Sequence, residues 1–589
     1  MNQISHEPTR WNLQRLYPNE LNQTLSNELN EIKILIHYLK EETYSKFNSE
    51  SFIDEKMLQI FSKVRSRLEK AEYYCYCLSS ESKDHSILTS LHSNITSLKD
   101  GVHSLLSDWK KYISKLPVEI QKEWYSLPFV QPFISDLSTN MYTGIEEQMI
   151  NFTRNELNYW KDMYTQLKNK LEIELIDDDN KKIVSFSEVN DLAMNHDDPI
   201  NRMKAFELLT SKLDKEKDLF GTVFNNFARL RLSQNDALQK DDILSDSLHS
   251  NEISRESLFT MWETIDKNLK DLTRFLDFKK NNVERLTWHQ LMTSQQNEQS
   301  KMPFSKAVEE IFNSFKNIDD EIAQFALHAI TDGWVDAEPR TNKPPGGFCA
   351  PFLSEGESRI SLRYDGTIES ARILAHEIGH AWHFKQLKDA PSLSFLKEHF
   401  PMSIAECSSI LFELIFVDHL ITVTSDLEIK QSLLNYKIQS SLNYLMAVRG
   451  SFIFEQLFYE KSKDGPLSPI QIEELSIESQ KRAYGDSLEQ YQPFVWIKYG
   501  HFYEPNIPFY NYPYTFGYLL SLGLLAIAKQ DGSEFNSKYK RFLSETGKRP
   551  VEELVYHYFH IDLSNPQFWQ QSVNQIIKDI EEYIDLSNN

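Results

Sequence analysis

Cysteine and glycine are both scarce in this chain of 589 residues. Its four cysteines are too few and too irregularly spaced for a disulfide framework, and Cys75 and Cys77 are too close to bridge each other. We therefore expect free thiols in a reducing compartment, for these two and for Cys349 and Cys407. The 17 glycines are about 3% of the chain, against about 7% in an average protein. Because few residues interrupt helices, we expect a mainly α protein.

Positive charge and long apolar runs are also lacking. The 63 Lys and Arg residues face 86 Asp and Glu, which gives a formal net charge of −23. Such a surface repels phosphate backbones and anionic lipids, so we expect no nucleic-acid partner and no membrane partner. The longest apolar run, at 516–528, is too short to span a bilayer. The start, "MNQISHEPTRWNL", lacks the apolar core of a secretion signal, which favours a cytoplasmic location.

Apolar residues recur at helical spacing over most of the chain, and we predict helices at 20–110, 145–240, 250–330, 402–422 and 435–462. A polar stretch at 176–182 predicts a turn within the second of these regions. Glycine and proline gather at 331–366, and "RISLRY" at 359–364 alternates polar and apolar residues, which predicts a short strand. Thr367 is a suitable N-cap for the helix that follows.

That following helix contains "AHEIGHAWHF" at 375–384. His376 and His380 are four residues apart, so they lie on one face of the helix, where two imidazoles can share a metal ion. Glu377 projects beside such an ion and could accept a proton from water. The alternative is a polar turn on a half-exposed helix, which the neighbouring apolar residues disfavour.

A zinc site needs a third protein ligand. His383 lies about 10.5 Å along the axis from His376, which is too far, so we expect it to be structural or to face substrate. Glu406 is the better ligand because a carboxylate in the apolar stretch 402–416 needs a partner. Glu413 could orient a ligating imidazole. An exposed stripe of glutamates is the alternative for both. Gly379 would let a second helix come close to the metal.

The chain resembles the oligoendopeptidase F branch of the thimet oligopeptidase-like zinc metallopeptidases. The resemblance covers most of the chain and rests on an ordered set of stretches: "RWNLQRLYP" (10–18), "GWVDAEPRTNKPPGGFCAPF" (333–352), "HEIGHAWH" (376–383), "AECSSILFE" (405–413), "HFYEPNIPFYNYPYTFG" (501–517) and "NPQFWQQSV" (565–573). One departure is the pair His289 and Gln290, where relatives often carry an acidic residue. The role of that segment in substrate binding is therefore not carried over.

The resemblance implies a large two-lobed helical metallopeptidase with a deep central channel and a small β-sheet beside the zinc helix. It further implies an N-terminal helical region at 1–110, an oligopeptidase F-type subdomain at 111–190 and a catalytic domain at 191–589. Carried over by position, one Zn²⁺ ion is bound by His376, His380 and Glu406, with Glu377 as the catalytic base. The residues that would stabilise the tetrahedral intermediate are His501 and one or more of Tyr510, Tyr512 and Tyr514.

The activity expected is hydrolysis of internal bonds in short unfolded oligopeptides, in the service of intracellular peptide turnover. An extended substrate could pair with the strand at 359–364 and with the backbone around Gly346 and Gly347, unless this is an ordinary surface hairpin. One alternative is a zinc exopeptidase, carboxypeptidase-like, on the same scaffold. Another is a non-catalytic peptide-binding relative, which the intact Glu377 disfavours.

Overall fold

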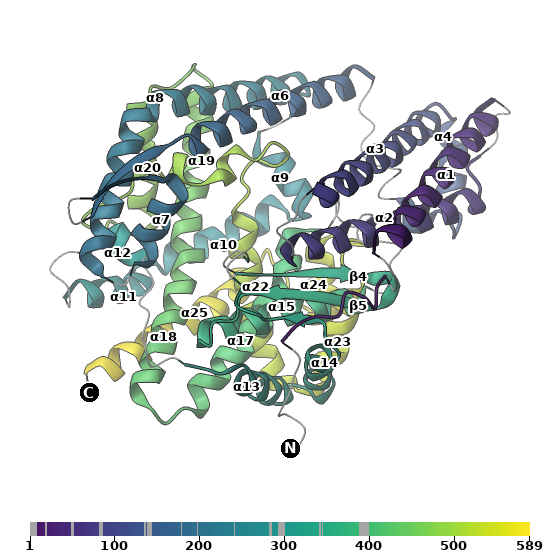
Figure 1. Cartoon of the computed structure of the whole chain (residues 1–589). Coiled ribbons are helices and arrows are strands. Elements are labelled where there is room, and N and C mark those ends of the chain that lie inside the picture. The colour runs from purple at the N-terminus through teal and green to yellow at the C-terminus, as the bar shows by residue number, and fades with distance from the viewer. Residues whose placement is uncertain are drawn as a thin grey trace. The chain divides into compact units, whose positions relative to one another are not determined.

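Helices make up most of the structure, as the scarcity of glycine predicts (Figure 1). The structure is a computed structural model and describes residues 9–17, 21–48, 52–81, 86–134, 137, 144–177, 180–196, 198–240, 242–281, 286–292, 301–340, 343, 346–387 and 400–588. The first eight residues of the predicted N-terminal segment lie outside these ranges. The expected free thiols are confirmed, since all four cysteines are unbridged.

The chain forms two compact units that alternate along the sequence. Unit 1 comprises 1–141, 300–422 and 524–561, and unit 2 comprises 142–299, 423–523 and 562–589. The predicted subdivision at 110/111 and 190/191 stays a prediction. Within the described residues, no helix is both long enough and apolar enough to cross a bilayer.

Unit 1 contains a helical N-terminal part, a small sheet and the helices around it. Its elements are α1 (Leu21–Asn48), α2 (Glu55–Glu81), α3 (Ser86–Ser114), α4 (Val118–Tyr125), the 3₁₀ turn η1 (Gln131–Phe133), α13 (Phe304–Lys316), α14 (Asp320–Thr331), β3 (Val335–Asp336), β4 (Gly347–Phe352), the 3₁₀ turn η2 (Leu353–Glu355), β5 (Glu357–Leu362), α15 (Ile368–Gln386), α17 (Met402–Val423), α23 (Ser533–Ser544) and α24 (Val551–Phe559).

The three long N-terminal helices share one apolar core. Phe61 of α2 and Trp109 of α3 lie against each other in it, with ring centroids 4.9 Å apart, and both are almost entirely buried. Ala350 and Phe352 of β4 belong to the same core. The N-terminal helices are therefore packed onto the sheet that borders α15.

The sheet has the strand order β3–β5–β4. β4 runs antiparallel to β5, with Cys349 opposite Ile360, and β3 runs parallel to β5. The strand predicted at 359–364 is confirmed as β5, which starts and ends two residues earlier. Pro351 lies in β4, and a proline, which has no N–H to donate, suits an edge strand. The sheet packs on α15, which confirms the small β-sheet predicted beside this helix (Figure 1).

Unit 2 is helical apart from one hairpin. Its elements are α6 (Gly144–Asn169), β1 (Glu172–Asp177), β2 (Asn180–Ser185), α7 (Phe186–Asn195), α8 (Pro199–Ala237), α9 (Leu244–Asn251), α10 (Arg255–Lys267), α11 (Leu269–Asn281), α12 (Trp288–Met292), α18 (Leu427–Leu442), the π-helical turn η3 (Asn443–Ala447), α19 (Val448–Ser462), α20 (Pro469–Ala483), α21 (Val495–Lys498), the 3₁₀ turn η4 (Gly500–Tyr503) and α25 (Pro566–Asn588). Helix α22 (Tyr512–Asp531) runs from unit 2 into unit 1.

The region of the predicted turn at 176–182 is part of a β-hairpin. β1 and β2 pair antiparallel, with Ile173 opposite Val184. These two side chains are buried, whereas Glu174 and Ile183 point outward. Each strand is only six residues long, so its alternation of buried and exposed residues is a weak signal beside the long helical patterns. The sequence therefore indicated a break in the helical pattern but not the two strands.

Candidate metal centre

Three side chains from two helices of unit 1 converge on one point. His376 and His380 come from α15, and Glu406 comes from α17. The Nε2 atoms of the two histidines lie 3.6 Å and 3.7 Å from Oε2 of Glu406. These three atoms are all within 4.8 Å of one another. Ligand atoms at about 2.1 Å from a tetrahedrally coordinated ion are about 3.4 Å apart, so the spacing fits a bound metal.

The donor atoms also have the chemistry of a zinc site. The distances of 3.6 Å and 3.7 Å between Oε2 of Glu406 and the two Nε2 atoms are longer than hydrogen bonds. Direct hydrogen bonds to the imidazoles therefore do not explain the position of this carboxylate. The three side chains keep 18–27% of their surface exposed, which lets solvent reach the site. The guanidinium of Arg372 acts on Glu377 and Glu413, and the two imidazoles act on Glu406, so the acidic donor set fits a divalent cation.

Glu413 stands behind one of the imidazoles. Its Oε2 lies 3.1 Å from Nδ1 of His376 and 2.9 Å from Nη1 of Arg372. A carboxylate on Nδ1 fixes the tautomer that presents Nε2 to a metal. The place predicted for Glu413, behind an imidazole, agrees with this contact, whereas Arg372 was not predicted, although it lies four residues before His376 and therefore on the same face of α15.

The charges of this cluster are strongly coupled. Burial lowers the pKa of His376, but the carboxylates of Glu406 and Glu413 outweigh it and raise the pKa to about 10. Burial lowers the pKa of His380 to about 4. Burial raises the pKa of Glu406, yet His376 and His380 together bring it down to about 2. The cluster thus favours positive charge between its carboxylates.

Gly379 lets α15 and α17 come close together. A Cβ atom at this position would lie 2.6 Å from the carbonyl oxygen of Ser408 and 2.7 Å from the Cα atom of Ser409, both in α17. The Ser408 hydroxyl also donates to the Gly379 carbonyl at 2.9 Å. The prediction that Gly379 permits close approach of a second helix is confirmed.

Glu377 is 5% exposed and lies against the glycine that begins β4. A Cβ atom on Gly347 would come within 2.9 Å of Oε1 of Glu377. Gly346 has a φ of +92° and open space around it. Burial raises the pKa of Glu377 to about 7, while the charges of His376 and Arg372 lower it. The side chain is thus held beside the ligands on α15 and under the edge strand.

His383 lies inside the protein rather than at its surface. It is 1% exposed, its Nε2 is 3.1 Å from the Thr546 hydroxyl, and its ring packs on Phe400 at 5.1 Å. Burial lowers its pKa to well below the usual range, to about 3. A neutral, hydrogen-bonded imidazole here links α15 to the loop after α23.

The remaining predicted residues belong to unit 2. The rings of His501 and Tyr510 lie 4.9 Å apart, and those of Tyr510 and Tyr514 lie 6.1 Å apart. His501 is exposed and the two tyrosines are half-buried. Tyr512 is 1% exposed, with its hydroxyl 3.4 Å from the amide nitrogen of Asn251. Of the three tyrosines, two therefore share a surface with His501.

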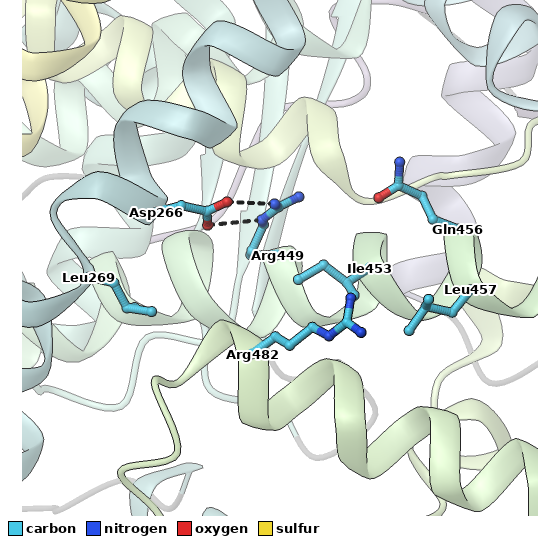
Figure 2. A pocket seen from close by; sticks show the side chains of 7 residues that line it. All are labelled: Asp266, Leu269, Arg449, Ile453, Gln456, Leu457 and Arg482. Atoms are coloured by element: carbon cyan, nitrogen blue, oxygen red, sulfur yellow. Dashed lines mark hydrogen bonds and ion pairs between the residues drawn. The ribbon is translucent and has the colours of Figure 1, made fainter.

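Unit 2 also has a pocket of about 370 Å³ that contains none of the predicted residues (Figure 2). Its lining includes Arg449, whose guanidinium is bound to the carboxylate of Asp266, with Nη2 at 2.7 Å from Oδ2. The same guanidinium stacks over Trp262 at 4.9 Å. Arg449 is thus neutralised and held in place by its own neighbours.

Comparison with known proteins assigns the chain to a family. The model for peptidase family M3 matches residues 192–575. An oligoendopeptidase F homolog of Borreliella burgdorferi is 23% identical over 596 residues, which cover 97% of this chain and 96% of the relative. The chromosomal oligoendopeptidase F of Lactococcus lactis subsp. cremoris is 21% identical over 322 residues, which cover 54% of this chain and 52% of the relative. The predicted resemblance to oligoendopeptidase F is confirmed.

Solved structures share the fold. Oligoendopeptidase-F from Enterococcus faecium superposes with a TM-score of 0.69 at 15% identity, over 96% of this chain and 99% of that chain. A crystal structure from Chlamydophila abortus reaches a TM-score of 0.83 at 19% identity, over 98% of both chains. Since the family match spans more than half of this chain and includes α15 and α17, the chain belongs to peptidase family M3 and is a metalloendopeptidase.

Proposed function

We propose that this metalloendopeptidase holds a zinc ion with His376, His380 and Glu406 and hydrolyses internal bonds of short, unfolded peptides. The observation that carries the proposal is the convergence of two Nε2 atoms on one carboxylate oxygen, at 3.6 Å and 3.7 Å from it, where solvent reaches α15 and α17. Two imidazoles and a carboxylate are the ligand set of many catalytic zinc sites, which leave one position for water.

When bound, the zinc supplies Lewis acidity, which lowers the pKa of water toward about 7 and polarises the scissile carbonyl. Glu377 accepts the proton that the attacking water gives up and passes it to the departing amine. Its position is fixed by burial and by the absence of a side chain at Gly347. Glu413 accepts from Nδ1 of His376 and so keeps Nε2 free to bind the metal.

His501 and Tyr510 are proposed as the donors that stabilise the negative charge on the carbonyl oxygen, with Tyr514 as the second phenol of the cluster. Their support is the contact of their rings on one exposed surface of unit 2. Removal of one such donor costs about 10²–10³-fold in kcat. Tyr512 is assigned a packing role because its ring is buried and its hydroxyl faces Asn251.

Strand β4 is proposed as the edge to which an extended substrate adds. β5 lies between β3 and β4, so its own edges are already used. On its other side β4 pairs with no strand in the described residues. Pairing through backbone groups reads few side chains, which predicts broad specificity for peptides with an extended backbone.

The first test replaces the proposed base. Glu377→Gln keeps the shape of the side chain but cannot take up a proton, so kcat for a quenched-fluorescent peptide is expected to fall by about 10²–10⁴-fold. Zinc content, measured on the same samples, stays at one ion per chain because the substitution removes no ligand. Glu321→Gln, at an exposed residue of α14, is the control and retains wild-type turnover. Unchanged turnover of the Glu377→Gln enzyme would rule out the proposed role.

A second assay distinguishes the endopeptidase from the exopeptidase alternative. The same peptide is offered with both ends blocked and with both ends free, and products are identified by mass. Internal cleavage of the blocked peptide at a similar rate is expected. Loss of cleavage on blocking would favour an exopeptidase, and zinc binding without any cleavage would favour the non-catalytic alternative.

A further inference from the structure

The segment that carries His501 and Tyr510 contains a backbone outlier. Phe509 has a φ of +52°, in the left-handed region that a bulky side chain rarely adopts. It is also 4% exposed, so the conformation is enclosed by the protein. Strained residues persist where their surroundings fix them, and they gather at functional sites. The conformation of Phe509 therefore needs partners that hold it.

Helix α19 holds this residue at both its backbone and its ring. The carboxylate oxygen Oε2 of Glu455 accepts the Phe509 N–H at 3.0 Å. The Phe509 ring packs on those of Phe452 and Tyr459, at centroid distances of 5.2 Å and 5.7 Å. Glu455 is 3% exposed, so its carboxylate is shielded from water and accepts a hydrogen bond from this N–H instead.

A second buried charge holds the same segment five residues earlier. Arg231 of α8 donates to the backbone carbonyl of Glu504 and to the hydroxyl of Tyr459. The side chain of Glu504 pairs in turn with Lys161 at 2.9 Å. The stretch from Glu504 to Phe509 is thus fixed at both ends, by Arg231 and by Glu455.

A carboxylate is an expensive choice for a buried helix position that packing alone could fill with an apolar residue. Burial raises the pKa of Glu455 to about 7, and the charge of Arg231 and the Phe509 N–H lower it. Two groups explain the carboxylate, the charge of Arg231 and the Phe509 N–H that it accepts. Tyr510 follows Phe509 directly, so the direction of its ring depends on the turn at Phe509.

We propose that Glu455 is a positioning residue for hydrolysis: by accepting the Phe509 N–H, it fixes the left-handed turn that orients Tyr510 beside His501. The inference rests on the proposed function, in which Tyr510 donates to the reacting carbonyl oxygen. Glu455 itself touches neither substrate nor metal. It acts through the backbone of one residue.

The first test follows the backbone and does not depend on activity. In Glu455→Leu the Phe509 N–H loses its acceptor, so amide exchange in a peptide covering 507–511 is expected to become at least tenfold faster. Glu455→Gln keeps an oxygen acceptor and retains the slow exchange. The control is Asp579→Asn, which removes a partly buried carboxylate paired with the buried Lys437 at 2.8 Å in the same unit and leaves the 507–511 peptide unchanged. Unchanged exchange in folded Glu455→Leu would overturn the proposal.

The second test uses kinetics. Glu455→Leu is expected to lower kcat for the blocked peptide by about 10–100-fold with KM within threefold, and Glu455→Gln to restore most of it. Because Glu455 acts through Tyr510, the double variant with Tyr510→Phe should be no slower than Tyr510→Phe alone, within twofold. Multiplied losses would overturn the proposal. If Tyr510→Phe itself has wild-type kcat, the proposed function of Tyr510 fails, whereas the exchange result still decides whether Glu455 holds the turn.

A third comparison leaves Glu455 in place. Phe509→Gly and Phe509→Ala both remove the ring, but glycine adopts the left-handed region at little cost and alanine does not. Phe509→Gly is therefore expected to have the higher kcat and a thermal midpoint no lower than that of Phe509→Ala. The opposite order would show that the left-handed turn at residue 509 does not determine kcat. It would overturn the proposal even if Glu455→Leu does not fold.

Discussion

Lys498 is a cation enclosed by the protein, at 7% exposure. Its Nζ lies 4.9 Å from the centre of the Trp288 ring and 3.6 Å from Sδ of Met194. Burial, together with the charge of Lys168, lowers its pKa from 10.5 to about 8. Burial also lowers the pKa of Lys168 to about 8. The sulfur of Met194 and the ring of Trp288 do not replace the water that a charged ammonium loses on burial. The charge of Lys498 therefore lowers the free energy of unfolding.

This cost has a defined dependence on pH. Between pH 8 and 10.5 the unfolded chain binds the Lys498 proton more strongly than the folded one, so stability rises with pH over that window. Below pH 8 the buried charge lowers the free energy of unfolding by its full amount. This amount is about 3 kcal/mol, at about 1.4 kcal/mol per pKa unit. Lys498→Met is expected to raise the free energy of unfolding by about 1–3 kcal/mol at pH 7, and by much less near pH 10.5.

Thermal unfolding of wild type and Lys498→Met at pH 7 and pH 10.5 measures this difference. Lys267→Met, at an exposed lysine of the same unit, is the control and should move the midpoint little at either pH. A Lys498→Met midpoint that exceeds the wild-type value by the same amount at both pH values would contradict the explanation. The difference must shrink as the pH rises.

At the scale of elements, the proposed metal centre depends on the contact between α15 and α17. Glu406 reaches the two histidines only because the backbone of α17 lies against Gly379. Backbone atoms cannot move aside as a flexible side chain can, so even one methyl group must separate the helices.

Gly379→Ala is therefore expected to lower zinc affinity by at least tenfold and the thermal midpoint by several degrees, although alanine is the better helix former by about 1 kcal/mol. Competition with a chromophoric chelator measures the affinity. Ala381→Gly, two residues along the same buried helix, is the matched control and should destabilise the protein without a comparable loss of zinc. Retention of wild-type affinity in Gly379→Ala would contradict the role of the close contact.

At the scale of the whole molecule, the two units draw on different parts of the chain. The proposed zinc ligands lie in unit 1, whereas His501 and Tyr510 lie in unit 2. A metal that binds only the folded form stabilises it by about 4 kcal/mol at a free concentration 1,000 times Kd. This stabilisation should be localised in unit 1.

Chelation of the metal is expected to lower the thermal midpoint and to speed amide exchange in α15 and α17, while exchange in α25 of unit 2 stays unchanged. Glu406→Ala lacks a ligand and should respond little to the chelator. Equal loss of protection in α25 and α15 would show that the metal stabilises the chain as a whole, contrary to this expectation.

The arrangement of the proposed metal ligands on α15 was predictable because it is local. His376 and His380 share a face through helix geometry alone, and Glu377 follows from the same spacing. The Thr367 cap is also local, since its side chain accepts the N–H of Ser370 three residues on. Glu406 needed a further argument, namely that a carboxylate in an apolar helix requires a partner.

Other features followed only from contacts between distant parts of the chain. Arg372 and its pairing with Glu413 depend on how α15 meets α17. The burial of Tyr512, and its separation from Tyr510, depend on α9 through Asn251. Glu455 is 54 residues from the N–H that it holds, and no local pattern marks Phe509 as left-handed.

The sequence by itself determined a mainly helical protein and the order of its candidate metal ligands, because helical periodicity and capping involve residues at most a few positions apart. The tertiary structure decided how closely α15 and α17 approach and which buried charges are held by which backbone groups. Such contacts join residues far apart in the chain, and their energies depend on shape and burial that only the folded protein possesses.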